Sequence, residues 1–131
     1  EDHLRSICPE IEWLAAENAN DDPEQAYSKT CKMLTDHPQI DTIFVVAAGV
    51  KDVCRGVIDT GRQHDLRVIA YDDVPSTREM IRQGLVRAVV CQQPLEQGYR
   101  SFAAAFDMII SNSTVHPACI MEDQIKIIEN L

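Results

Sequence analysis

Two apolar segments of this sequence each end in a pair of polar residues. The segment "VIAYDD" ends in Asp72 and Asp73, and "VRAVVCQQP" carries Gln92 and Gln93. A carboxylate can accept hydrogen bonds from two hydroxyl groups, whereas a primary amide both donates and accepts them. Fixed planar groups of this kind suit recognition of a small hydroxylated solute, because a buried hydroxyl without a partner costs about 1–3 kcal/mol. We therefore predict that Asp72 and Gln92 bind a ligand.

Structural roles compete for the two neighbouring side chains. Asp73 immediately precedes the helical segment "VPSTREM", and a short carboxylate at that place is typical of an N-cap. We expect Asp73 to be the N-cap of this helix and keep it as a possible ligand contact. Gln93 fits an exposed residue at the edge of a sheet.

Catalysis is not expected at these positions, so we predict no catalytic residues and a protein that is not an enzyme. A nucleophile needs a base within hydrogen-bond reach, but the four histidines are scattered and no G-x-S-x-G motif occurs. Adjacent carboxylates on a strand point to opposite faces, so Asp72 and Asp73 would not flank one glycosidic bond. A response-regulator receiver resembles the chain in length, but its acidic pair follows the first strand rather than the third. The segment "VVAAGVKD" has one glycine, too few to wrap a phosphate.

The composition is that of a globular domain with an acidic surface. The chain has 131 residues and a formal charge of -9, and its twelve basic residues form no run, so we expect no nucleic-acid contact from this segment. No apolar run approaches the roughly 20 residues of a membrane helix, and "EDHLRSICPE" lacks the apolar core of a signal peptide. Five cysteines without a CxxC pair predict no metal site and no cofactor. Free thiols in that number favour the reducing cytoplasm.

Short apolar strands alternate with amphipathic helices along the chain. Asp22 is expected to cap a helix that has Pro23 at its first position and ends at His37. We expect Gly49 to be a turn residue between a strand and a helix. A longer helix should begin near Pro94. Strands are expected over residues 11–16, 41–49, 66–73 and 86–91, with short candidates at 120–121 and 125–128, and "SNSTVHPA" reads as a loop.

This alternation predicts right-handed βαβ units, a mostly parallel sheet and helices on both faces of the sheet. The continuous apolar run over residues 41–49 predicts a strand that is buried on both faces. In such sheets ligands bind beyond the carboxyl ends of the strands. The strand ends at 47–49, 72–73 and 92–93 should therefore meet at one edge.

Three long segments together resemble the ligand-binding fold of periplasmic sugar-binding proteins, which LacI/GalR-type transcription regulators share. They are "DDPEQAYSKTCKMLTDHPQIDTIFVV", "GVKDVCRGVIDTGRQHDLRVIAYDDVP" and "IRQGLVRAVVCQQPLEQGYRSFAAAFDMI", followed by a closing "ENL". The resemblance implies an α/β fold, a three-layer αβα arrangement with a mostly parallel sheet, as in the Rossmann-like lobe of a type I periplasmic binding protein. Residues 1–93 would be the C-terminal lobe without its first strand and helix. Residues 94–117 would be a helix and loop of the absent N-terminal lobe, and residues 118–131 a return strand segment.

The resemblance also places ligand contacts. The family's Asp in "GFD" or "GYD" falls on Asp72 of "AYDD", and its hinge Gln in "AQxP" falls on Gln92. Where the family usually has Asn in "ND", this chain has "AAGVKDV", so that Ala48 and Val50 are possible contacts in its place.

The function that the resemblance implies is the effector-binding domain of a LacI-family transcriptional regulator in the cytoplasm. A carbohydrate-like effector would close two lobes and change DNA binding by a headpiece outside this chain, in a homodimer without membrane contact. The alternative is an extracytoplasmic sugar-binding protein, periplasmic or extracellular, of an ABC transporter or chemoreceptor system.

Overall fold

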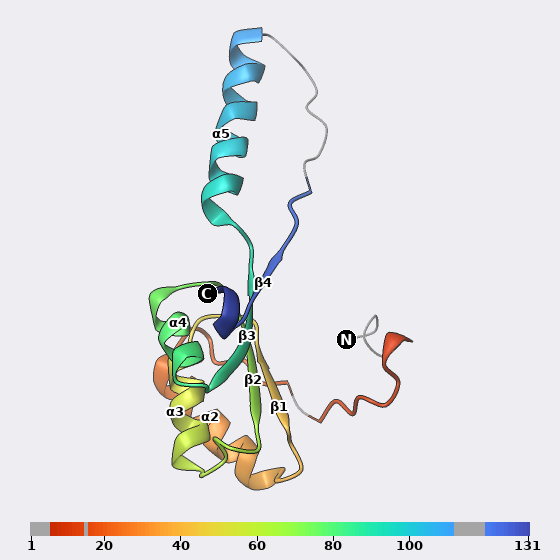
Figure 1. Cartoon of the computed structure of the whole chain (residues 1–131), viewed down its shortest axis with the longest axis vertical. Coiled ribbons are helices and arrows are strands. Elements are labelled where there is room, and N and C mark those ends of the chain that lie inside the picture. Colours follow the sequence, from red (N-terminus) through yellow and green to blue (C-terminus); the bar gives the residue numbers. More distant parts are fainter. Residues whose placement is uncertain (1–5, 15, 112–119) are drawn as a thin grey trace.

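The computed structural model describes residues 6–14, 16–111 and 120–131. Helices and strands alternate through most of this range, as the sequence predicts (Figure 1). In chain order they are α2 (Pro23–Asp36), β1 (Thr42–Val45), α3 (Val50–Asp59), β2 (Arg67–Tyr71), α4 (Pro75–Arg82), β3 (Val86–Cys91), α5 (Pro94–Ser111), β4 (Gln124–Lys126) and the short 3-10 helix η1 (Ile128–Asn130).

The four strands form one sheet in the order β1-β2-β3-β4. The pairs β1–β2 and β2–β3 are parallel, while β4 is antiparallel to β3. The α/β class and the mostly parallel open sheet are therefore confirmed. Because β1, β2 and β3 run the same way, their carboxyl ends meet at one edge of the sheet.

The start of α2 follows from its sequence. The Asp22 side chain accepts a hydrogen bond of 2.8 Å from the backbone N–H of Gln25, with Pro23 at the first helical position. The last helical residue is Asp36, and His37 is the C-cap, which agrees with the predicted end of the helix. Gly49 is confirmed as a turn residue, because it has a φ of 100° at the junction of β1 and α3.

The core lies between the sheet and helices α2, α3 and α4, which Figure 1 shows on the same side of the strands. The prediction of helices on both faces, in three layers, is therefore wrong for the described residues, which place helices on one face only. Val68 and Val89 are fully buried there. The prediction that the strand of β1 is buried on both faces is wrong, since its residues alternate between exposed and buried and Phe44 is 43% exposed. The ring centroid of Phe44 lies 5.6 Å from that of Tyr71. Figure 1 shows no described helix on the side of the sheet opposite α2, α3 and α4.

The strand predicted over residues 11–16 is also wrong for the residues that the structure describes in it. Residues 11–14 and 16 have no regular structure, and Ile11 and Trp13 are partly exposed. A strand needs a neighbour for its backbone N–H and C=O groups. Figure 1 shows this segment away from the sheet, so that it has no such neighbour.

Helix α5 extends away from the sheet (Figure 1). It begins at Pro94, as predicted, and several large apolar side chains on it are exposed, among them Phe102 at 73% and Ile109 at 80%. The predicted loop at 111–118 lies almost entirely outside the described residues. Of the two short strands predicted after it, 120–121 is wrong, and the other corresponds to β4 at Gln124–Lys126.

Two helical glycines provide a matched test of the packing of α3 on α2. A Cβ added to Gly56 in α3 would lie 3.0 Å from the Cβ and Cγ2 atoms of Thr30 in α2, whereas a Cβ added to Gly98 in α5 would meet nothing within 4 Å. We expect Gly56→Ala to lower the free energy of unfolding by about 1–3 kcal/mol through overpacking. Gly98→Ala should not lower it, because alanine favours helices. Urea unfolding followed by circular dichroism measures both; equal stability of the two variants would contradict this packing.

Candidate functional site

Asp72 is the first residue after β2, and its carboxylate faces solvent. Its backbone N–H donates a hydrogen bond of 2.9 Å to the carbonyl of Val90, which continues the β2–β3 ladder beyond the end of β2. The residue has a φ of 66°, a left-handed conformation in which Asp is one of the few tolerated residues. Its side chain is exposed and makes no hydrogen bond or ion pair with any residue in the described ranges. The carboxylate is therefore free to accept hydrogen bonds from a solute.

Gln92 occupies the equivalent place after β3. Its side chain is exposed, and its amide makes no hydrogen bond to the part of the chain that is described. Its backbone carbonyl accepts a hydrogen bond from the side-chain amide of Gln97, which ties the strand end to the first turn of α5. Because Tyr71 is paired with Val90 in the parallel β2–β3 ladder, Asp72 and Gln92 lie at the same edge of the sheet. The structure thus brings together the two side chains that the sequence singled out first.

Asp73 differs from Asp72 because its carboxylate is fully engaged by the protein. Arg78 of α4 donates two hydrogen bonds to it, from Nε at 2.5 Å and from Nη2 at 2.8 Å. Lys126 of β4 places Nζ 2.5 Å from Oδ2 of the same carboxylate. The prediction that Asp73 caps α4 is wrong: the N-cap is Val74, without a side-chain hydrogen bond, because the Asp73 oxygens are already bound to the two cations.

These cations determine the charge state of Asp73. The two hydrogen bonds from Arg78, and after them the one from Lys126, lower the pKa of Asp73 from 3.8 to about 2, although partial burial opposes the shift. Burial and the charge of Asp73 in turn raise the pKa of the neighbouring Cys91 thiol. Asp73 is thus a fixed anion that is already neutralised within the protein.

The remaining candidates flank the turn at Gly49. Ala48 is exposed and brings no polar side-chain atom to the edge. The Val50 side chain is 6% exposed and belongs to the core under α3, so that it does not reach solvent at this edge. Of the candidates that the sequence singled out, Asp72 and Gln92 are therefore the two whose polar side chains make no hydrogen bond or ion pair within the described residues, and they come from adjacent strands.

Gln93, expected as an exposed edge residue, is half-buried and has a structural contact. Its side-chain Nε2 donates a hydrogen bond of 2.6 Å to the carbonyl of Glu122, just before β4. Sequence reasoning missed this contact and the roles of Arg78 and Lys126. Arg78 follows Asp73 by five residues and could have been proposed from that spacing, but the contact with Lys126 depends on the antiparallel pairing of β4 with β3.

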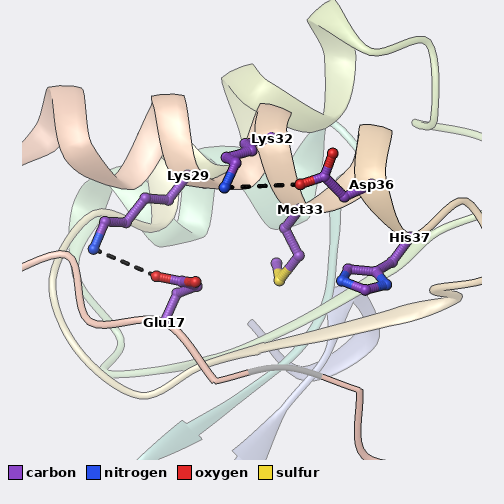
Figure 2. A pocket seen from close by; sticks show the side chains of 6 residues that line it. All are labelled: Glu17, Lys29, Lys32, Met33, Asp36 and His37. Carbon is purple, nitrogen blue, oxygen red and sulfur yellow. Dashed lines mark ion pairs between the residues drawn. The ribbon is translucent and has the colours of Figure 1, made fainter.

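A separate hollow of about 230 Å³ lies between α2 and the segment that precedes it (Figure 2). Figure 2 shows its charged side chains paired with each other: Lys29 with Glu17 at 3.4 Å, and Lys32 with Asp36 at 3.8 Å. The hollow is smaller than a typical ligand pocket of about 300–1,000 Å³. Since its charges neutralise one another and it lies away from the strand ends, we do not assign a ligand to it.

Other site types have no support in the described ranges. No group of three or more His, Cys, Asp or Glu side chains there is placed to hold a metal ion. Among the helices in those ranges, none combines the length and the apolar character required to cross a bilayer.

Comparisons with known proteins agree with the architecture. A family model described as a periplasmic binding protein domain matches residues 1–113. No curated protein sequence matches the chain.

Several solved structures have the same fold. A glucose-galactose binding protein from Geobacillus stearothermophilus is 24% identical with a TM-score of 0.87, and the match covers 99% of this chain and 46% of that one. An ABC transporter solute binding protein from Agrobacterium vitis with bound D-fucose is 15% identical with a TM-score of 0.87, over 98% and 44% of the two chains. A Caulobacter myo-inositol binding protein bound to myo-inositol is 22% identical with a TM-score of 0.85, over 98% and 45%. The chain therefore spans less than half the length of these structures.

The charge state of Asp73 can be tested by titration. Its pKa is about 2 in the folded protein and 3.8 without its partners. A lowered pKa stabilises the fold above the unfolded-state value, and this stabilisation is lost as the pH falls from about 4 to about 2. Carboxyl-carbon NMR should give a midpoint for Asp73 near pH 2, and Arg78→Met should raise it. A midpoint near 3.8 in the folded wild type would exclude the charge cluster around Asp73.

Proposed function

Because this chain belongs to the periplasmic binding protein domain family, we propose that it forms one lobe of a carbohydrate receptor, with Asp72 and Gln92 as its polar contacts to the sugar. The observation that carries the proposal is the placement of a free carboxylate and a free amide on adjacent strand ends at one edge. Together they can accept hydrogen bonds from sugar hydroxyls and donate one to a ring or hydroxyl oxygen.

A receptor is favoured over the LacI/GalR regulator that the sequence led us to expect. The three solved structures described above are a glucose-galactose binding protein, a solute binding protein with bound D-fucose and a myo-inositol binding protein. They support a carbohydrate or polyol as the ligand class. They give no support to a DNA-binding partner or a homodimer, and we propose neither.

The cysteines favour the regulator as the second candidate. Cys8, Cys31, Cys54 and Cys91 are free thiols, and burial raises the pKa of Cys54 to about 12. Unpaired thiols are typical of proteins in a reducing compartment, whereas a receptor outside the cytoplasm would meet oxidising conditions. The two candidates share the same sugar contacts and differ in what the closing of the lobes controls.

The intact protein should supply a second lobe. We propose that residues 1–93 belong to the lobe described here, that 94–117 enter the other lobe, and that 118–131 return. Two features support a second lobe: α5 extends away from the sheet with exposed apolar residues, and Phe44 of β1 is 43% exposed on a sheet whose described helices lie on one side. Apolar surface of this kind is normally buried against another element. A strand and helix placed before residue 1 would cover this face and provide a neighbour for residues 11–14 and 16.

Sugar binding would act by closing the two lobes. A ligand shifts a protein toward the closed state only if it makes better contacts there than in the open state. Asp72 and Gln92 would contact the sugar from this lobe, and the second lobe would contact it from the opposite side. The chain by itself should therefore bind sugars without gaining the contacts made on closure.

We expect the 131-residue chain to bind sugars weakly, with a Kd on the order of 1 mM or weaker, because it lacks the opposing surface. The ¹H–¹⁵N NMR spectrum should be recorded with D-glucose, D-galactose, D-fucose and myo-inositol in turn. At least one should cause saturable shifts of the amides at 72–73 and 92–93. Micromolar affinity would contradict the claim that this chain carries only one of the two surfaces that contact the sugar. The absence of any shift at these amides with all four compounds would contradict the proposed ligand class.

In the protein with both lobes, Asp72→Asn should weaken sugar binding by about 1–3 kcal/mol, because it replaces a charge-assisted hydrogen bond. Asp41→Asn is the matched control, since Asp41 is exposed at the opposite end of the strands, just before β1. Calorimetry should show unchanged affinity for the control. Equal affinities of the two variants would remove Asp72 from the site.

A further inference from the structure

The chain leaves and re-enters the lobe through two adjacent segments. Residues 92–94 lead from β3 into α5, and residues 120–123 lead back into β4 (Figure 1). Cys91 at the end of β3 is paired with Gln124 at the start of β4. Just beyond this pair the Gln93 side chain donates its hydrogen bond to the Glu122 carbonyl. The two segments are therefore joined to each other at the point where they leave the sheet.

The strand β4 needs an anchor because it is short. It has three residues, Gln124–Lys126, and among the described strands it pairs with β3 alone. Ladder hydrogen bonds along so short an edge strand provide little protection against local opening. Its last residue, Lys126, reaches across β3 to Asp73, which follows β2.

We propose that Asp73 is a positioning residue, which clamps β4 to the lobe through Lys126 and thereby confines the hinge to residues 92–94 and 120–123. The proposal assigns to Asp73 a role different from that of its neighbour Asp72, which stays free for the ligand. The part that rests on the proposed function is the hinge, because a hinge matters only if two lobes close on a sugar. The contact between Asp73 and Lys126 is present without a sugar.

The contacts of Asp73 explain why the clamp can act on β4 alone. Its side chain is 11% exposed and that of Lys126 is 26% exposed, so the pair is shielded from water much more than an ordinary surface ion pair. Arg78 holds the same carboxylate from α4, independently of Lys126. If Lys126 is removed, Asp73 keeps one cationic partner and the lobe keeps its fold, while β4 loses its link to β2 and α4.

Hydrogen–deuterium exchange of the 131-residue chain without sugar tests the clamp. In Lys126→Met, peptides covering residues 124–131 should exchange about five- to thirtyfold faster, the factor that corresponds to about 1–2 kcal/mol. Peptides from β1 and β2 should keep their wild-type protection. Lys126→Arg should restore most of the protection, because it keeps the charge. Lys32→Met is the matched control: it removes a lysine from an exposed pair with Asp36 and should change nothing in residues 124–131.

A double substitution separates the clamp from a general effect on stability. Asp73→Asn should also accelerate exchange in residues 124–131, and Asp73→Asn combined with Lys126→Met should accelerate it no further than the single changes. Unchanged exchange in Lys126→Met would overturn the clamp, and so would a loss of protection that extends equally to β2. Faster exchange of residues 124–131 alone would support it even if no sugar bound the wild type, a result that would count against the proposed function only.

Discussion

The parallel ladder between β2 and β3 determines where the candidate contacts of this chain lie. It pairs Tyr71 with Val90, and the N–H of Asp72 extends it by one more hydrogen bond to the Val90 carbonyl. This last bond holds Asp72 beside the end of β3 in a left-handed conformation, where its carboxylate faces solvent next to Gln92. If the register were shifted by one residue, the buried and exposed side chains of β2 would exchange faces. The site therefore depends on the same pairing that forms the core.

The two adjacent aspartates differ in the contacts that their carboxylates make. The Asp72 carboxylate has no partner in the ranges that the structure describes, whereas the Asp73 carboxylate lies between Arg78 and Lys126. A carboxylate neutralised by two cations has little left to offer a sugar hydroxyl. A free one keeps its acceptor capacity, because water is its only competing partner. We therefore propose Asp72 for the ligand and Asp73 for the attachment of the return strand.

Much of this arrangement could be predicted from local patterns. The cap at Asp22, the turn at Gly49 and the helix from Pro94 follow from short-range chemistry and are found as expected. The strand ends at Asp72 and Gln92 follow from two apolar runs and the parallel topology. These features need only residues that are close in sequence, together with a general rule for α/β sheets.

The errors arise where distant residues decide the outcome. The segment predicted as a strand over residues 11–16 is apolar enough, but its described residues, 11–14 and 16, have no described strand beside them. The run at 41–49 faces solvent on one side because no described helix covers it. Asp73 is a good N-cap residue by type, yet Lys126, 53 residues later, competes successfully for its carboxylate. Composition and spacing do not reveal such competition. It becomes visible only when the pairing of β4 with β3 is known.

The most direct test of the central claim is a crystal structure of the intact protein with a bound sugar. The account predicts sugar oxygens within about 3 Å of both the Asp72 carboxylate and the Gln92 amide, at the carboxyl ends of β2 and β3. A sugar held elsewhere, with both of these side chains still in contact with water alone, would contradict it.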